Sequence, residues 1–180
     1  LGEVSTSRWK NTRWVLIRVP TVAYAMQAKC DYETILEMFF SSCFLDWESE
    51  KKKWIRWSET LNKGRQVHIV GQGTDLTMSV EGRTWIPACG GNNMPDGEIA
   101  TAPVCESVNG TIYFENPAVL SGRLVYGLAL SWENGKLVRA KSDTEQAFLQ
   151  SILNTDAGSS QIGELAIGTN PNVNRFCNDI

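Results

Sequence analysis

The strongest constraint on the fold is an alternation of apolar and polar residues that recurs between positions 65 and 141. In Thr74–Val80, for example, Leu76 and Met78 alternate with polar residues. A period of two residues is the pattern of a β-strand with one buried face. Asn134-Gly135, which separates two such runs, is a strong signal for a tight hairpin. We therefore predict an antiparallel β region. Its strands are expected over residues 65–70, 74–80, 83–86, 111–114, 123–132 and 136–140.

The residues before position 65 have the patterns of one strand and of helices. Residues 13–19, with the sequence RWVLIRV, are a nearly continuous apolar run that ends at a proline, as in a buried strand. A short helix is expected over residues 22–29. A longer helix begins near Asp31, a good N-cap residue, and continues to the stop signal Asn62-Lys63-Gly64. Its apolar residues recur at helical spacing and are Ile35, Met38, Phe39, Cys43, Trp54, Trp57 and Leu61.

Helical signals return after position 141. Ser142-Asp143-Thr144-Glu145 has the spacing of a capping box, in which the Ser142 side chain accepts a backbone hydrogen bond and Glu145 reaches back. The chain then restarts at Asn154-Thr155-Asp156 into a second helical turn that carries Glu164. Helices before and after a set of antiparallel strands indicate an α+β fold. The strand at 13–19 and its helices look like the end of an α/β unit whose earlier strands are absent.

Composition argues against several classes of function. The 180 residues carry 17 Lys+Arg and 20 Asp+Glu, so the net charge is -3, and this gives no general support to binding of nucleic acid or of anionic membranes. No apolar run approaches the about 18 residues of a membrane span, and the first residues lack the pattern of a signal peptide. The five cysteines form no close pair and are interpreted as reduced cytosolic thiols. The single histidine argues against a His-rich metal site or a His-based triad.

Three motifs suggest a function but are better explained by structure. Gly71-Gln72-Gly73 follows a predicted strand, yet it lacks the third glycine and the following helix of a dinucleotide-binding loop. His68 has the chemistry of a metal ligand or general base, but its place in an alternating strand favours a residue on the polar sheet face. Trp47, Trp54 and Trp57 could stack on bases or sugars, whereas their helical spacing favours packing or a subunit interface.

Two acidic residues in Gly-rich segments are the best candidates for chemistry. In Asn92–Glu98, Pro95 fixes the backbone and Asp96-Gly97 supplies a tight turn that presents Glu98 at the start of the next segment. The alternative is an ordinary hairpin turn with a solvated Glu98. Glu164 lies between small and apolar residues, where a carboxylate needs a cation or hydrogen-bond donors. The two acids could share a pair of metal ions, although alone they complete neither coordination shell.

Specific blocks of residues occur along nearly the whole chain in the order seen in one protein family. They are Gly73-Thr74-Asp75-Leu76-Thr77, Asn93-Met94-Pro95-Asp96-Gly97-Glu98, Thr101-Ala102-Pro103, Ser107-Val108-Asn109-Gly110, Pro117-Ala118-Val119, Gly122-Arg123 and Gly163-Glu164-Leu165-Ala166-Ile167-Gly168-Thr169-Asn170-Pro171. The sequence thereby resembles the aminopeptidase T/aminopeptidase S family, the thermophilic metalloproteases (M29). The PDGE block at 95–98 and the GELAIGTNP block at 163–171 are specific to it.

The resemblance implies a cytoplasmic aminopeptidase, commonly a homodimer, that removes the N-terminal residue from peptides. It also implies two cocatalytic divalent ions, typically zinc or cobalt, with manganese or magnesium as further candidates. Glu98 matches the family's first metal-binding glutamate and Glu164 the second. The family's other site residues, two His, a Tyr and an Asp, lie in a segment after the block matched by Asn172–Ile180. His68 lies in the wrong block to replace them.

The resemblance also divides the chain into two parts. Residues 1–64 match the last portion of the family's N-terminal α/β domain, and residues 65–180 match the first part of the largely antiparallel β catalytic domain. Both domains are then incomplete, as expected of an internal fragment. The alternative function is a catalytically inactive structural fragment without a complete metal site. A solute- or carbohydrate-binding module that uses its tryptophans is a third possibility, with only composition behind it.

Overall fold

The computed structural model describes residues 2–177, so residue 1 and residues 178–180 of the two expected domains lie outside the described residues. Helices fill the first part of the chain and mostly antiparallel strands fill the second, which confirms the predicted α+β class. The helices are α1 (Gly2–Asn11), α2 (Val22–Gln27), α3 (Tyr32–Cys43), α4 (Trp47–Leu61) and α5 (Gln146–Leu153). The strands are β1 (Leu16–Ile17), β2 (Gln66–Gly71), β3 (Thr74–Ser79), β4 (Ile86–Ala88), β5 (Asn93–Met94), β6 (Glu98–Thr101), β7 (Asn109–Phe114), β8 (Ala118–Leu120), β9 (Arg123–Val125), β10 (Leu128–Glu133), β11 (Lys136–Lys141) and β12 (Leu165–Gly168).

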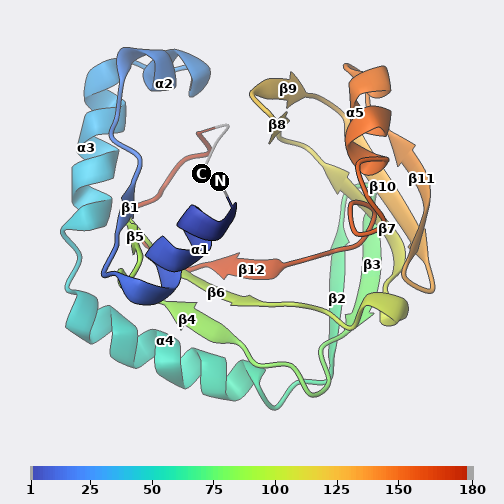
Figure 1. The fold of residues 1–180 in the computed structure, drawn as a ribbon, viewed down its shortest axis with the longest axis horizontal. Helices are drawn as coiled ribbons and strands as arrows, with labels where there is room; N and C mark the ends of the chain where they lie inside the picture. Colours follow the sequence, from blue (N-terminus) through green and yellow to red (C-terminus); the bar gives the residue numbers. More distant parts are fainter. Residues whose placement is uncertain (1, 178–180) are drawn as a thin grey trace.

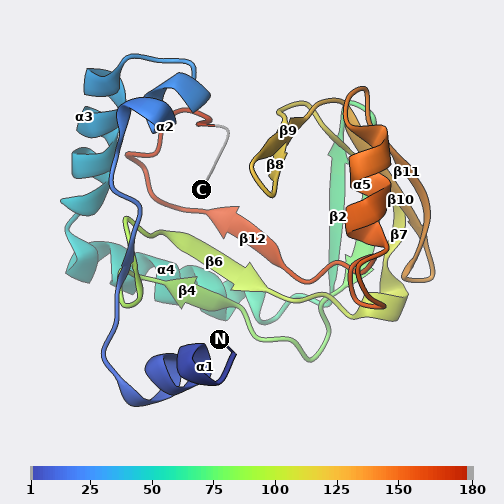
Figure 2. The same ribbon diagram turned by 45° about the horizontal axis from the view of Figure 1, so that its top comes forward.

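Two antiparallel sheets organise the β region. One has five strands in the order β11-β10-β7-β3-β2, and the other has three strands in the order β12-β6-β4. The three-stranded sheet lies between α2 and α3 on one side and the five-stranded sheet on the other, and α4 runs along it next to β4 (Figures 1 and 2). The sheet that carries both candidate acids is therefore central in the molecule.

Two aspartate caps explain the division of the helical region. The Asp31 side chain accepts a hydrogen bond from the Thr34 backbone N–H at 2.7 Å, as predicted. Asp46 accepts one from the Ser49 N–H at 3.1 Å. The second cap starts a new helix, so the single long helix predicted over this region is in fact α3 and α4, separated by residues 44–46.

Aromatic residues link the helical region to the sheets. Trp54 on α4 is fully buried and packs in one cluster with Val80, Trp85 and Ile99. A second cluster covers the inner face of the five-stranded sheet and includes Leu76, Met78, Val108 and Trp132. Leu165 packs partly against both clusters, so strand β12 contacts the two cores at once.

Three strand predictions are wrong in extent. The strand predicted over 83–86 shares only Ile86 with the observed strand β4. The apolar run at 13–19 forms only the two-residue strand β1, which pairs in parallel with β5, and the side chains of Leu16 and Ile17 are exposed. The run predicted over 123–132 is divided into β9 and β10, because Gly127 adopts a positive φ of 60°. The hairpin prediction is confirmed, since Asn134 and Gly135 both have positive φ, as a type I′ turn requires.

The capping box at 142–145 does not form. Glu145 adopts a left-handed conformation, and its carboxylate accepts a hydrogen bond from Arg123 at 2.8 Å instead of reaching the Ser142 N–H. The Gln146 side-chain oxygen instead accepts the hydrogen bond from the Ser142 N–H, at 2.7 Å. The helical turn predicted to carry Glu164 is also wrong, because residues 165–168 pair with β6 as strand β12. Within residues 2–177, none of the helices has the length and apolar character needed to cross a membrane.

Candidate metal centre

Glu98 begins the central strand of the three-stranded sheet. It lies opposite Ala88 on β4 and Gly168 on β12. Directly opposed residues point to the same face of a sheet, so small residues flank the Glu98 carboxylate on both sides. The following residue, Ile99, points to the other face and is buried in the cluster with Trp54. The prediction that the turn presents Glu98 at the start of the next segment is therefore confirmed.

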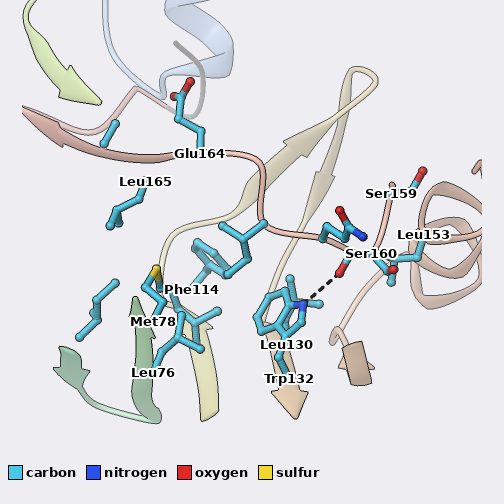
Figure 3. Close-up of a pocket in the computed structure, with 15 residues that line it drawn as sticks. Leu76, Met78, Phe114, Leu130, Trp132, Leu153, Ser159, Ser160, Glu164 and Leu165 are labelled. Atoms are coloured by element: carbon cyan, nitrogen blue, oxygen red, sulfur yellow. Dashed lines mark hydrogen bonds between the residues drawn. The ribbon is translucent and has the colours of Figure 1, made fainter. Parts of the chain in front are cut away.

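Glu164 comes from a distant part of the chain to the same face of the sheet. It directly precedes Leu165, which lies opposite Thr101 on the buried side. Because side chains alternate along an extended chain, Glu164 faces the open side, as Glu98 does. Figure 3 shows its carboxylate pointing away from the apolar side chains of Met78 and Phe114. The fold thus brings the two predicted acids together on one surface.

The two carboxylates interact electrostatically. Burial raises the pKa of Glu98 above its usual value, and the negative charges of Glu164 and then Asp96 raise it further. Like charges that repel each other on a half-buried face are stabilised by a shared cation. Carboxylate oxygens are the hard donors that divalent ions such as magnesium and manganese accept, and that zinc also binds.

The Asp96 carboxylate accepts hydrogen bonds from backbone groups of its own loop. Its two oxygens accept hydrogen bonds from the backbone N–H groups of Gly90 at 2.8 Å and Gly97 at 2.9 Å. These contacts fix the turn that leads directly into Glu98. Asp96 is therefore a structural residue of the turn.

Asn170 belongs to the GELAIGTNP block, but its structural role in the site region was not predicted from the sequence. Its buried side-chain N–H₂ group donates to the backbone carbonyls of Asp96 at 2.8 Å and Ser42 at 3.2 Å. The neighbouring Thr169 N–H donates to the Gly97 carbonyl at 2.8 Å. The Asn-Pro dipeptide that begins with Asn170 was a usable signal, because the residue before a proline is conformationally restricted.

Gly97 allows this close approach. Its φ is 123°, a region that favours glycine, and a Cβ atom added there would lie 2.6 Å from the Asn170 Cβ. The segment with Glu98 and the segment with Glu164 are thus locked together one residue before Glu98.

The other sequence candidates lie elsewhere. His68 is exposed on β2, an edge strand of the five-stranded sheet, with its Nε2 2.9 Å from the Asp75 carboxylate. Gly71-Gln72-Gly73 forms the turn of the β2–β3 hairpin, which agrees with the rejection of a nucleotide loop. Trp47 packs edge-on against Trp54, with ring centroids 6.0 Å apart, as expected for packing.

Three of the five cysteines are poorly suited to act as nucleophiles. All five are free, and burial raises the pKa of the thiols of Cys43, Cys89 and Cys177. Over residues 2–177, no group of three or more His, Cys, Asp or Glu side chains is placed to hold a metal ion. The described chain therefore offers two carboxylates that fit a divalent ion as part of a larger ligand set.

Comparison with known proteins agrees with this picture. A sequence profile of the thermophilic metalloproteases (M29) matches residues 4–179. Aminopeptidase T from Thermus aquaticus is 36% identical over 110 residues, which cover 56% of this chain and 27% of that protein. Aminopeptidase 2 from Geobacillus stearothermophilus is 25% identical over 178 residues, which cover 86% of this chain and 43% of that protein. The chain spans between about a quarter and a half of the length of these relatives.

Solved structures share the fold. Wild-type AmpT from Thermus thermophilus has a TM-score of 0.70 and 30% sequence identity, with 76% of this chain and 38% of that chain covered. A 2,5-dihydroxypyridine dioxygenase from Pseudomonas putida has a TM-score of 0.65 over 96% of this chain and 55% of that chain, but at 14% identity this likeness concerns the fold alone. Because the family profile covers almost all of the sequence, the chain belongs to the thermophilic metalloprotease (M29) family.

Proposed function

We propose that this chain forms part of a metal-dependent aminopeptidase, in which Glu98 and Glu164 bind a pair of divalent ions. The observation that carries the proposal is the placement of both carboxylates on one open face of the three-stranded sheet, within electrostatic reach of each other. The names of the relatives supply the reaction, which is release of an N-terminal residue from a peptide.

The residues of this chain would act mainly by positioning. Ala88 and Gly168 leave free space on both sides of Glu98, so that an ion and a substrate can approach the sheet. Bound divalent ions would supply a water of lowered pKa and polarise the scissile carbonyl. The Asp96-Gly97 turn and Asn170 hold Glu98 in place relative to the strand that follows Glu164.

The metal ions, the substrates, the oligomeric form and the domain division are proposed on the basis of the family to which the chain belongs. Zinc or cobalt are the proposed ions, with manganese or magnesium as alternatives. Peptides with a free N-terminus are the proposed substrates, and a cytoplasmic homodimer is the proposed form. Residues 1–64 are proposed as part of the N-terminal α/β domain, and residues 65–180 as part of the catalytic domain.

Hydrolysis of two matched substrates tests the proposal. The metal-loaded full-length protein is expected to cleave leucine p-nitroanilide and to leave N-acetyl-leucine p-nitroanilide intact, because only the first has a free amino group. A chelator should abolish the reaction, and added zinc or cobalt should restore it. Cleavage of both substrates at equal rates, or full activity in the chelator, would contradict the proposal.

The inactive-fragment alternative has one observation in its favour, the absence of a cluster of three or more candidate ligands among residues 2–177. Calorimetric titration of the 180-residue chain with zinc separates the two functions. Two tightly bound ions and turnover by the chain alone would exclude the alternative. Absence of tight binding by the chain, together with binding by the full-length protein, would show that the remaining ligands lie outside these residues.

A further inference from the structure

Lys29 and Tyr126, which are 97 positions apart in the sequence, are in contact at the surface of the molecule. The Lys29 Nζ donates a hydrogen bond to the Tyr126 hydroxyl at 3.4 Å. It also lies 5.6 Å from the centre of the Tyr126 ring, within the range of a cation–π interaction. Lys29 follows the C-cap residue of α2, and Tyr126 directly follows β9. The contact therefore joins the helical region to the β region.

This contact lies on the side of the three-stranded sheet to which the candidate acids point. The buried face of β6 packs against α4, so Glu98 and Glu164 face away from that helix. On the same side of the sheet, the end of α2 and the β8–β9 hairpin lie opposite each other beyond strand β12 (Figures 1 and 2). The contact between Lys29 and Tyr126 thus spans one approach to the two carboxylates.

The backbone at Lys29 has a conformation that favours glycine. Its φ is 55°, in the left-handed region. Its N–H donates to the Met26 carbonyl and the following N–H donates to the Ala25 carbonyl, both at 3.1 Å, which is the hydrogen-bond pattern of a Schellman motif. Glycine is the usual residue at this position of the motif, and another residue strains the backbone there. A lysine in place of glycine indicates that the side chain has a use, and the contact with Tyr126 supplies one.

Tyr126 is held on a fixed turn. Its N–H donates to the Thr144 hydroxyl at 3.0 Å, and its carbonyl accepts a hydrogen bond from the Asp143 N–H at 2.8 Å. Gly127 follows with a positive φ of 60°, and a Cβ atom added there would overlap the Asp143 carboxylate. The tyrosine is therefore anchored on the connection into α5, and the lysine side chain is the part of the contact that can move.

The strength of the contact suits repeated opening. Lys29 is exposed and Tyr126 is half-buried, so water competes for both groups. An exposed cation–π contact favours the joined state by a factor of about two to five. A preference of this size lets the contact open and form again, so that it restricts access without locking the two regions together.

We propose that Lys29 and Tyr126 form a latch, which is closed in the empty protein and opens to admit a peptide to the face with Glu98 and Glu164. For the identity of the substrate, the inference rests on the proposed aminopeptidase function. A small anilide passes a closed latch more easily than a peptide does. The rate at which peptides bind should therefore follow the fraction of molecules in which the latch is open.

The test uses Lys29→Gly, with Ser121→Gly as the matched control. Both residues have positive φ, 55° and 47°, so glycine relieves the backbone at both, but Ser121 lies at the exposed turn of the β8–β9 hairpin. In the metal-loaded full-length protein, kcat/KM is measured for a decapeptide with N-terminal leucine and for leucine p-nitroanilide. Lys29→Gly should raise the ratio of peptide to anilide by about two- to fivefold, and Ser121→Gly should leave it unchanged.

Two further variants separate a latch from a purely structural contact. Tyr126→Leu should raise the same ratio as Lys29→Gly does, and the double variant should add no further increase, because both changes remove one contact. Lys29→Gly should unfold in urea at the wild-type concentration or above it, since glycine fits the left-handed backbone. A ratio that stays at the wild-type value in a folded, active Lys29→Gly protein overturns the latch and leaves the aminopeptidase proposal standing.

A measurement without metal or substrate tests the latch independently of the reaction. A bulky, neutral gadolinium chelate broadens the NMR signals of the methyl groups that it can reach. The Ala166 methyl group lies two residues after Glu164 on the same sheet face. In the metal-free full-length protein its broadening should increase about two- to fivefold in Lys29→Gly and stay unchanged in Ser121→Gly.

The two experiments have distinguishable failures. Equal broadening of the Ala166 signal in wild-type protein and Lys29→Gly overturns the latch, whether or not the protein cleaves peptides. If broadening increases as expected but neither the decapeptide nor the anilide is cleaved, the aminopeptidase proposal is overturned and the latch over this face is supported.

Discussion

The Asn170 side chain donates a hydrogen bond of 2.8 Å to the backbone carbonyl of Asp96, a residue 74 positions earlier in the chain. Asp96 lies two residues before Glu98, and Asn170 lies two residues after the last residue of β12. The contact therefore joins the two segments that carry the candidate metal ligands. It also reaches α3, because the same amide group donates to the Ser42 carbonyl.

Asn170→Ala should weaken metal binding more than it weakens the fold. Loss of the two hydrogen bonds, one buried and one partly buried, is expected to lower the free energy of unfolding by about 1–3 kcal/mol. Residues that orient metal ligands typically change metal affinity by about 10- to 100-fold, and a loss in this range is expected from zinc titration of the full-length protein at a temperature where it stays folded. Asn172→Ala is the control, since its side chain donates to the Ser41 carbonyl at an exposed position. Equal zinc affinities in the two variants would show that Asn170 does not position the metal ligands.

Gly97→Ala should destabilise the protein through a direct clash. The new Cβ atom would lie 2.6 Å from the Asn170 Cβ, at a φ of 123° that L residues rarely adopt. Strain and overpacking together should cost about 2–4 kcal/mol of unfolding free energy, measured by urea denaturation. Gly163→Ala, where nothing lies within 4 Å of an added Cβ, should change it by less than about 0.5 kcal/mol. A Gly97→Ala protein as stable as the control would show that the turn relaxes freely.

Local signals predicted much of this fold correctly. Asp31 caps α3 and Asn134-Gly135 forms the hairpin, because each depends on a few neighbouring backbone groups. Glu98 was placed correctly at the end of its turn for the same reason. The capping box failed where a distant residue competed, since Arg123 binds the Glu145 carboxylate.

The errors in the site region also come from long-range contacts. Glu164 was assigned to a helical turn, whereas pairing of Leu165 with Thr101 makes the segment a strand. The positioning role of Asn170 was not predicted, because its partners, Asp96 and Ser42, are far away in the sequence. The recognition of the family came from the specific blocks of residues, and neither periodicity nor composition pointed to it.

The Asp31 cap gives a pH-dependent contribution to stability. The Thr34 backbone N–H, then the Thr34 hydroxyl, hold the pKa of Asp31 below its usual value. A lowered pKa in the folded state means that the contribution is present above the unfolded-state pKa and is lost as the pH falls through the folded-state pKa. Asp31→Asn keeps a hydrogen-bond acceptor but has no charge to lose. The stability difference between wild-type protein and Asp31→Asn should therefore shrink in urea denaturation as the pH is lowered from 5 to 3, and a constant difference would contradict this assignment.

The tryptophans of α4 should differ sharply in their contributions to stability. Trp54 is fully buried, so Trp54→Ala should lower the free energy of unfolding by about 3–5 kcal/mol. Trp57 is 49% exposed, and Trp57→Ala should change it by less than about 1 kcal/mol. Oligosaccharide binding that is lost in Trp57→Ala would instead support the carbohydrate-binding alternative.

Metal content tests the central claim most directly. Full-length wild-type protein, Glu98→Gln, Glu164→Gln and the exposed-helix control Glu59→Gln are dialysed against zinc at a fixed free concentration, and bound zinc per chain is measured by mass spectrometry. Wild-type protein and Glu59→Gln should hold two ions per chain. Glu98→Gln and Glu164→Gln should each hold fewer while keeping the wild-type circular dichroism spectrum. Two ions bound with wild-type affinity in a folded Glu98→Gln or Glu164→Gln protein would contradict the assignment of that glutamate as a metal ligand.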